Sequence, residues 1–143
     1  MSALMFTCFV TPFEVPHRDE ISETVGFKVK GPEKTIIHLP DIDSWTAFSS
    51  DNTTLMRDVD VAWLDGTFFD ANELPHRDLS TISHPLMQES LSYFASLPEP
   101  LRRRIRFTHL NHSNPACNPA SEATRMVLDA GFCIADENEC VSL

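Results

Sequence analysis

The second half of this chain alternates between strand-like and helix-like hydrophobic patterns, and that alternation limits the possible folds more than any other feature. Val59–Leu64 is a nearly continuous apolar run of the kind found in strands buried on both faces. The segments that continue the pattern as helix, strand, helix and strand are Pro85–Leu97, Ile105–His109, the stretch from Ser121 to Gly131, and Phe132–Ala135. Strands that are joined through helices pair in parallel, so at least two crossover units share one sheet.

The first half of the chain predicts antiparallel strands instead. Thr24–Lys30 and Thr35–Leu39 flank a Gly-Pro turn and are expected to pair as a hairpin. Ala3–Val10 is β-prone and is expected to form another strand, which ends before Pro12. Together the two halves predict a mixed sheet of the α/β class within a single domain that spans residues 1–143.

The charge of the chain excludes one broad class of function. Its formal net charge is −10 at pH 7, so no face except a short arginine cluster can attract a nucleic acid backbone. We expect that cluster, which begins at Arg102, to be a solvated junction between a helix and a strand. No apolar run reaches the roughly 20 residues that a membrane span needs, and the cysteines lack the spacing of a zinc knuckle. We therefore expect a cytoplasmic protein with reduced thiols and without membrane or nucleic acid partners.

Polar and ionisable side chains gather where the predicted strands end. Asp41 follows the hairpin, Asp65 follows Val59–Leu64, and the stretch RIRFTHLNHSNP carries His109 and His112 at the end of another strand. Ligand sites in open α/β sheets lie outside strand ends, and imidazole with carboxylate suits borderline cations such as zinc. The pattern indicates a metal site, and two surface histidines beside a turn are the alternative interpretation.

The tetrapeptide that begins at Asp65 raises one further possibility. Asp65-Gly66-Thr67-Phe68 follows an apolar strand, as does the DxDGT signature of haloacid-dehalogenase-type phosphatases. The first aspartate of that signature is the nucleophile, and Trp63 occupies its position here. Because tryptophan cannot form an aspartyl phosphate, the sequence disfavours this class of phosphatase.

Five blocks of the sequence together resemble a known family. The blocks are VPHRDEISETVGFKV, LPDIDSW, LDGTFFDANELPHRD, ISHPLMQES and FTHLNHSNP, and they extend from Val15 to Pro115. Their order and spacing are similar to the C-terminal half of metallo-β-lactamase-fold proteins related to pyrroloquinoline quinone (coenzyme PQQ) biosynthesis protein B. The resemblance implies one lobe of a four-layered αβ/βα sandwich, with a two-metal site at the edge of the sheets.

The same resemblance implies roles for individual residues. His17, ahead of a Gly-aromatic strand, resembles one metal ligand, and Asp41, which closes a strand, resembles the carboxylate that bridges the two metals. His109, preceded by a threonine, resembles the late histidine that completes the second metal, with His112 as a second candidate. The implied metal is zinc, and iron or manganese are alternatives.

Hydrolysis is the chemistry that such a site implies. A metal held there would supply a water that is deprotonated near neutral pH and could attack an ester, lactone or phosphodiester of a small-molecule substrate. Asp41 and Asp65 are the expected catalytic carboxylates. The residues expected in the pocket or behind the ligands are Asp65, Glu73, His76, His84 and Asn111.

One motif of the superfamily is missing. The HxHxDH loop, which supplies most ligands of the first metal, does not occur in these 143 residues, so the sequence resembles one lobe of a two-lobed fold. We expect an apolar face where the other lobe packs, and with it a homo-oligomer or a separate partner that carries the N-terminal lobe. Two functions stay open: a metal-dependent hydrolase whose site is incomplete in this chain alone, and a non-catalytic lobe that acts as a subunit or binding protein.

Overall fold

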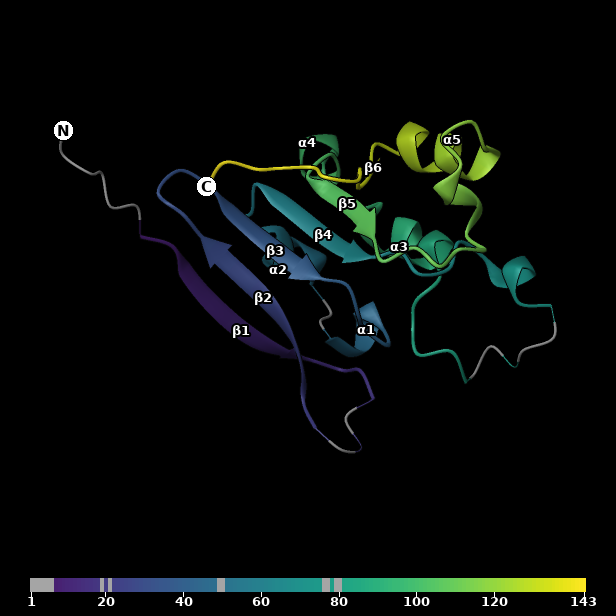
Figure 1. Cartoon of the computed structure of the whole chain (residues 1–143), viewed down its shortest axis with the longest axis horizontal. Helices are drawn as coiled ribbons and strands as arrows, with labels where there is room; N and C mark the ends of the chain where they lie inside the picture. Colours follow the sequence, from purple (N-terminus) through teal and green to yellow (C-terminus); the bar gives the residue numbers. More distant parts are fainter. Residues whose placement is uncertain (1–6, 19, 21, 49–50, 76–77, 79–80) are drawn as a thin grey trace.

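A six-stranded mixed sheet organises the fold in the computed structural model of the chain (Figure 1). The structure describes residues 7–18, 20, 22–48, 51–75, 78 and 81–143. The strands lie side by side in chain order: β1 (Phe9–Val15), β2 (Thr24–Lys30), β3 (Thr35–Leu39), β4 (Val61–Asp65), β5 (Ile105–Thr108) and β6 (Cys133–Ile134).

The pairing of the strands explains why the site forms at one edge. β1, β2 and β3 pair antiparallel, whereas β3, β4, β5 and β6 pair parallel. The predicted hairpin and the predicted crossover units are thus confirmed, and so is the α/β class. Because two antiparallel steps restore the original direction, β1, β3, β4 and β5 all run the same way. Their carboxyl ends therefore lie at the same edge of the sheet.

The first strand differs from the prediction. The sequence predicts a strand over Ala3–Val10 that ends before Pro12, but β1 begins at Phe9 and continues through Pro12 to Val15. Residues 3–6 lie outside the described part of the chain. β1 is an edge strand, and an edge tolerates proline because one row of its N–H groups needs no partner in the sheet. The prediction is wrong because it treated proline as a break in any strand.

Short helices connect the strands, and side chains cap their ends. They are α1 (Trp45–Phe48), α2 (Asn52–Met56), η1 (Ala71–Glu73), α3 (Met87–Phe94), α4 (Glu99–Arg102), η3 (Pro115–Cys117) and α5 (Glu122–Asp129). Asp51 accepts a hydrogen bond from Thr53 N at 2.9 Å before α2, and Ser121 accepts one from Thr124 N at 3.0 Å before α5. Gly131 follows α5 with a φ of +84°, which favours glycine. The two helices predicted for the second half are confirmed as α3 and α5.

The face of the sheet that packs on the helices forms the core. Leu39, Leu64 and Phe107 are neighbours across β3, β4 and β5, and all three are fully buried. Phe94 of α3 and Met56 of α2 belong to the same cluster of buried residues. Each of these side chains contributes roughly 1.5–3 kcal/mol through removal of apolar surface from water. This packing fixes the strand ends that carry the site.

The opposite face of the sheet is more open. Phe27, His38, Trp63 and Arg106 are in register across β2 to β5 on this face, and Phe27 is 40% exposed. The C-terminal segment crosses part of this face, because the Glu139 carboxylate binds both Trp63 Nε1 and the Arg106 guanidinium. Figure 1 shows the C-terminus beside the turn between β2 and β3.

The arginines at the junction of α4 and β5 are less solvated than the sequence predicts. Arg102 donates from Nε to Ala130 O at 2.9 Å and from Nη1 to Leu97 O at 2.6 Å. Arg104 donates to Val59 O at 2.9 Å. Both residues stay partly exposed, so the junction is solvated only in part, because carbonyl groups left unpaired where helices and turns end attract the donors of arginine.

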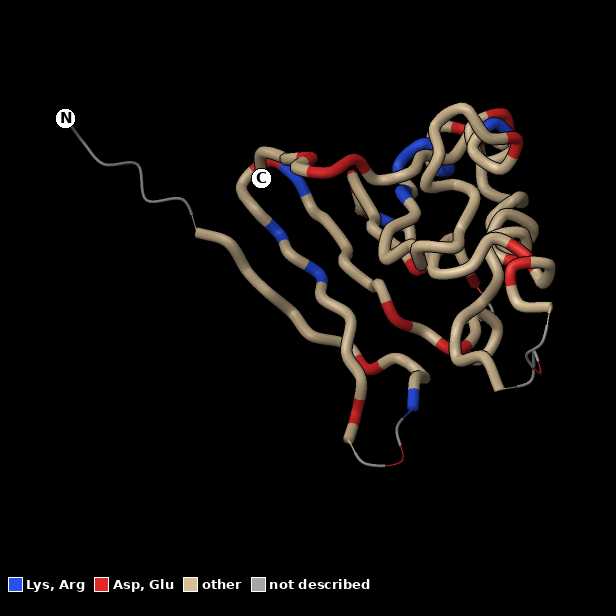
Figure 2. Tube along the Cα trace, turned by 45° about the vertical axis from the view of Figure 1, so that its right-hand side comes forward, with Lys and Arg blue, Asp and Glu red and all other residues tan. Residues whose placement is uncertain are grey.

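The surface of the molecule is predominantly acidic, as the composition of the chain predicts (Figure 2). Asp and Glu outnumber Lys and Arg by 21 to 11, and Figure 2 shows the acidic positions spread over the loops and helices. All four cysteines are free. Among the described residues, no helix has the length and hydropathy that crossing a bilayer requires.

Candidate metal centre

Four strands deliver polar side chains to one edge of the sheet. His17 lies just beyond β1, Asp41 lies just beyond β3, Asp65 is the last residue of β4, and His109 directly follows β5. Because these strands run in the same direction, the turns that follow them meet at this edge. The expected gathering of polar residues at strand ends is therefore present in the structure.

Asp41 lies between two histidines. Its Oδ1 is 3.8 Å from His17 Nε2 and 3.7 Å from His109 Nδ1. All three side chains remain partly exposed, so an ion from solvent can reach them. The structure thus brings together the three residues for which the resemblance implies metal binding, while the binding itself stays a prediction.

Asp43 holds the ring of His17. Asp43 Oδ1 lies 3.0 Å from His17 Nδ1, and an ionised carboxylate only accepts hydrogen bonds, so Nδ1 is the donor. A neutral imidazole that donates from Nδ1 carries its lone pair on Nε2, the atom that faces Asp41. Asp43 was not predicted as a site residue, although its position two residues after Asp41, across the buried Ile42, was a usable signal.

Asp65 is fully buried and accepts four hydrogen bonds. Its Oδ1 accepts from Thr67 N at 2.9 Å and from Thr67 Oγ1 at 2.8 Å. Its Oδ2 accepts from Ile42 N at 3.2 Å and from His84 Nδ1 at 2.7 Å. A buried carboxylate is stable only with such partners. These contacts place Asp65 behind His84 rather than on the open surface of the site.

His84 has a raised pKa. Partial burial of the ring lowers the pKa of His84, but the hydrogen bond and the negative charge of Asp65 raise it by more. The charges of Asp41 and Asp43 add to the increase. The site thus gives the imidazole of His84 an environment of carboxylates that favours a positive charge, whether a proton or a metal ion supplies it.

Thr67 connects two of the histidines. Its Oγ1 donates to Asp65, and it lies 3.2 Å from His84 Nδ1 and 3.0 Å from His109 Nδ1. His109 itself has a φ of 60°, in the left-handed region that a residue with a side chain rarely adopts. Thr67 was predicted only as part of a phosphatase-like tetrapeptide, and its position between the two rings has no local sequence pattern.

The remaining predicted residues do not lie among these ligands. His112 is exposed and belongs to neither group of potential ligands found in the described part of the chain. Ser113 Oγ donates a hydrogen bond to the Glu73 carboxylate at 2.9 Å and accepts one from Asn111 Nδ2 at 2.7 Å. Glu73 and Asn111 thus hold the loops beside the site. His76 lies outside the described residues.

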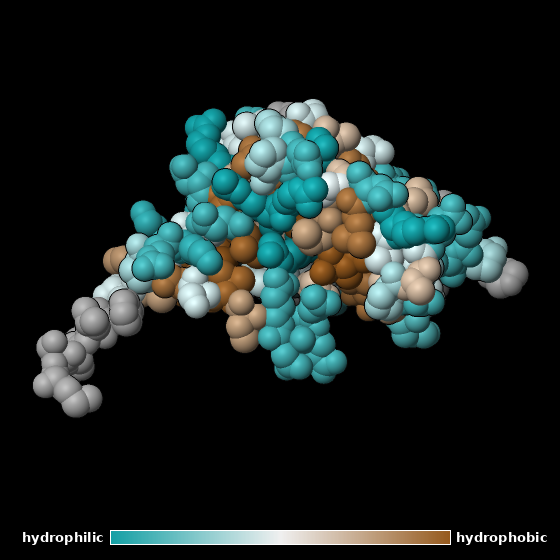
Figure 3. Space-filling model, turned by 90° about the horizontal axis from the view of Figure 1, so that it is seen from above, coloured by the Kyte–Doolittle hydropathy of each residue, from teal (hydrophilic) through white to brown (hydrophobic). Residues whose placement is uncertain are grey.

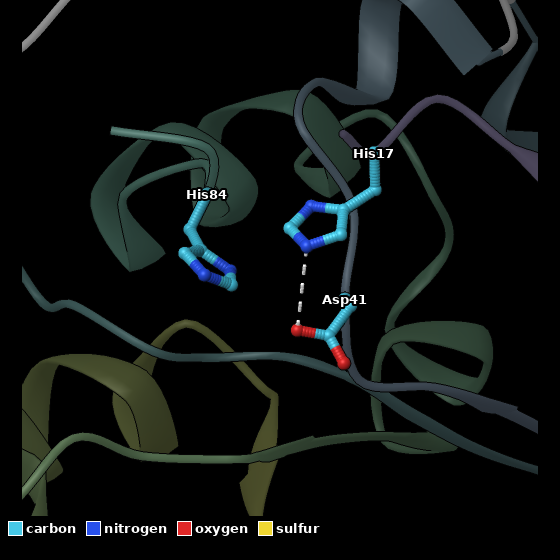
Figure 4. Close-up of side chains that lie close together, drawn as sticks. All are labelled: His17, Asp41 and His84. Carbon is cyan, nitrogen blue, oxygen red and sulfur yellow. Dashed lines mark ion pairs between the residues drawn. The ribbon is translucent and has the colours of Figure 1, made fainter. Parts of the chain in front are cut away.

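Two groups of side chains are close enough to hold an ion. Among the described residues, the ligand atoms of His17, Asp41 and His84 lie within 4.8 Å of one another, and so do those of Asp65, His84 and His109. Figure 4 shows the rings of His17 and His84 and the carboxylate of Asp41 around a common space. Imidazole and carboxylate suit zinc, iron(II) and manganese, so the donor set fits the metals that the resemblance implies.

A groove opens beside this cluster. It has a volume of about 840 Å³ and is bounded by His109, the helix α5 and the segment that follows β6. Leu110 and Leu128 give it an apolar lining, and Asp136 and Glu137 lie on it as well. A space of this size accommodates a small molecule. A molecule bound there would lie next to His109.

The fold and the cluster together define the class of protein. A mixed sheet has its histidines and aspartates at the carboxyl ends of strands that run in one direction. The family model for the β-lactamase superfamily domain matches residues 3–110, and the chain therefore belongs to this superfamily.

Particular relatives narrow the class further. The chain is 28% identical over 155 aligned positions to the coenzyme PQQ synthesis protein B of Methylobacterium sp. (strain 4-46). This alignment covers 98% of this chain and 50% of the relative. The crystal structure of zinc-bound PqqB from Methylobacterium extorquens matches with a TM-score of 0.75 at 20% identity, over 95% of this chain and 50% of that chain. The crystal structure of a diphosphatase from the PhnP family matches with a TM-score of 0.56 at 21% identity. That match covers 94% of this chain and 43% of the diphosphatase chain. The chain is a metallo-β-lactamase-fold lobe related to PqqB and spans about half the length of the relatives it matches.

Proposed function

We propose that this chain provides one half of a metal-dependent hydrolase site. The observation that carries the proposal is the position of Asp41, whose Oδ1 lies within 4 Å of both His17 and His109 at the edge where the strands end. A carboxylate between two imidazoles can serve two cations at once. Zinc is the proposed metal, because the matched PqqB structure is a zinc-bound one.

The residues of the chain would each perform a separate task. A bound metal ion supplies an activated water or polarises a substrate oxygen. Asp43 holds His17 with Nε2 free, and Thr67 holds His109. Partners of this kind are expected to maintain the orientation of metal ligands. Asp65 does the same for His84 while remaining away from solvent.

The groove beside His109 favours one substrate class. Asp136 and Glu137 lie on it, and the described residues that line it include no lysine or arginine. A phosphodiester would meet negative charge there without a compensating cation, whereas a neutral ester or lactone would not. We therefore propose a neutral ester or lactone of a small molecule as the substrate class.

A second lobe would complete the site. The HxHxDH loop is absent from these residues, and the chain matches about half of each relative. Val10, Val25 and Phe27 point to the open face of the sheet and are 59%, 37% and 40% exposed. Figure 3 shows hydrophobic surface on both sides of a hydrophilic ridge. An exposed apolar face of this kind favours a partner, and we propose the lobe that carries the remaining ligands.

A non-catalytic lobe is the second candidate. Each group of potential ligands in the described residues has three members, and three protein ligands do not by themselves make a two-metal site. In this case the chain binds a partner or a ligand through the same edge and turns over no substrate.

Reconstitution of hydrolysis separates these two functions. Purified chain is mixed with zinc and with the N-terminal half of a coenzyme PQQ synthesis protein B, and hydrolysis of chromogenic esters and lactones is followed. We expect no activity from either half alone, activity from the mixture, and none after Asp41→Ala. A mixture that forms a stable complex without any turnover would favour the non-catalytic lobe. Activity that persists in Asp41→Ala would contradict the proposed site.

A further inference from the structure

We propose that His84 is itself a metal ligand, and that His17, Asp41 and His84 hold one metal ion within this chain without a second lobe. The resemblance implies metal contacts for His17, Asp41 and His109, with His112 as a second candidate, but gives His84 only a place in the pocket or behind the ligands. The inference rests on the proposed function in one respect, namely that the metal lies at this edge of the sheet. It adds which residues hold the ion when this lobe is alone.

His84 occurs in both groups of potential ligands found in the described part of the chain. Neither group contains both His17 and His109, although Asp41 lies within 4 Å of each. Among the residues that the structure describes, each set of three ligands close enough to share one ion therefore includes His84.

The contacts of Asp65 decide between the two groups. All four hydrogen bonds of this buried carboxylate come from protein donors, and it would have to give up some of them to bind an ion. Asp41 is instead partly exposed and lies at 3.8 Å from His17 Nε2. Two ligands of one tetrahedral zinc ion lie roughly 3.4 Å apart, a spacing that the Asp41–His17 pair already approaches, and the ligand atom of His84 lies within 4.8 Å of both. The group of His17, Asp41 and His84 is therefore the favoured one.

The two imidazoles of this group are oriented in the same way. Asp43 accepts from His17 Nδ1 at 3.0 Å, and Asp65 accepts from His84 Nδ1 at 2.7 Å. Each neutral ring then carries its lone pair on Nε2. A carboxylate behind a histidine is the arrangement that metal ligands typically have. Its double occurrence is unexpected for two unrelated surface histidines.

The loops that carry the two histidines are also tied together. Arg18 Nε, next to His17, donates to Ser83 Oγ, next to His84, at 3.0 Å. The centroids of the two rings lie 5.2 Å apart. The three-ligand set leaves a fourth position open, as catalytic zinc sites do, whereas structural zinc sites usually have four protein ligands.

Zinc titration of single-histidine variants tests this inference. The affinity of the purified chain for Zn²⁺ is measured by competition with a chromophoric chelator for wild type, His84→Ala, His109→Ala and the control His38→Ala, which changes an exposed histidine on the open face of the sheet. Loss of a partner behind a ligand costs 10- to 100-fold in metal affinity, so loss of a ligand should cost at least as much. We expect His84→Ala to weaken binding by at least about tenfold and His38→Ala to leave it unchanged. His109→Ala should change it less than His84→Ala.

A second measurement on the wild-type chain avoids the question of whether a variant folds. Ring ¹⁵N chemical shifts of the histidines are recorded before and after one equivalent of Zn²⁺, and the signals of His17 and His84 should move together. Unchanged signals of His84 with shifted signals of His17 and His109 would overturn the inference and leave the proposed function intact. Unchanged signals of His17 would count against the proposed function as well.

Discussion

At the scale of single residues, the geometry of the site depends most on Asp65. Its four hydrogen bonds join the end of β4 to Thr67, to Ile42 and to His84. A buried charge contributes to stability only while its partners are in place, and its removal leaves donors without acceptors. The same residue therefore supports both the fold and the orientation of His84.

The substitution Asp65→Asn should affect both properties. An amide presents N–H groups to donors that need an acceptor, so we expect the free energy of unfolding to fall by roughly 2–3 kcal/mol and the zinc affinity to fall about 10- to 100-fold. Urea denaturation and chelator competition measure the two effects. The control Asp58→Asn changes an exposed residue whose φ of 57° asparagine tolerates, and it should leave both values near wild type. An unaltered zinc affinity in Asp65→Asn would show that the carboxylate does not position His84.

The sequence allowed the polar residues at strand ends to be located together, whereas residues that act through space had no sequence pattern. His17, Asp41 and His109 were identified from the resemblance, and the structure places Asp41 close to both histidines. Asp43 and Thr67 were missed because a hydrogen bond to a histidine 26 or 42 residues away has no local sequence pattern. The same limit applies to the grouping of His84 with His17.

At the scale of elements, the periodic second half was predictable and the first strand was not. Alternation of buried strands with amphipathic helices is specified locally, so β4, α3, β5 and α5 follow from the hydrophobic pattern. The location of β1 depends on its place at the edge of the sheet, where Pro12 is acceptable. Sheet order is a property of the whole chain, and no local rule supplies it.

Arg102 gives a prediction at this scale. Its guanidinium joins the region after α3 to the end of α5 through Leu97 O and Ala130 O. Arg102→Lys keeps the charge but loses the forked donors, so we expect the free energy of unfolding to decrease by about 1.5–3 kcal/mol. Arg103→Lys is the matched control, because Arg103 is exposed and pairs with Glu99 in the same helix turn, and it should change stability by at most about 0.5 kcal/mol. Thermal or urea unfolding measures both, and equal effects would refute the role of Arg102.

At the scale of the whole molecule, the open face of the sheet determines how the chain associates. Val10, Val25 and Phe27 are exposed there, away from the helices that cover the other face. In isolation we expect the chain to self-associate through this face in a concentration-dependent way. Sedimentation velocity should show dimers or larger species for wild type and a shift toward monomer for Phe27→Asp. Met126→Asp, which alters an exposed apolar residue of α5, should behave as wild type does. A wild-type chain that stays monomeric at high concentration would contradict this expectation.

The zinc content of the purified chain tests the central claim most directly. After equilibrium dialysis against micromolar Zn²⁺, elemental analysis should find one zinc ion per chain in wild type and none in Asp41→Ala, with wild-type content in the control Asp58→Asn. Asp41 belongs to the ligand set in both the proposed site and the inferred one, so its loss should remove the ion. Zinc content that is unchanged in Asp41→Ala, or two tightly bound ions in the wild-type chain, would contradict the account.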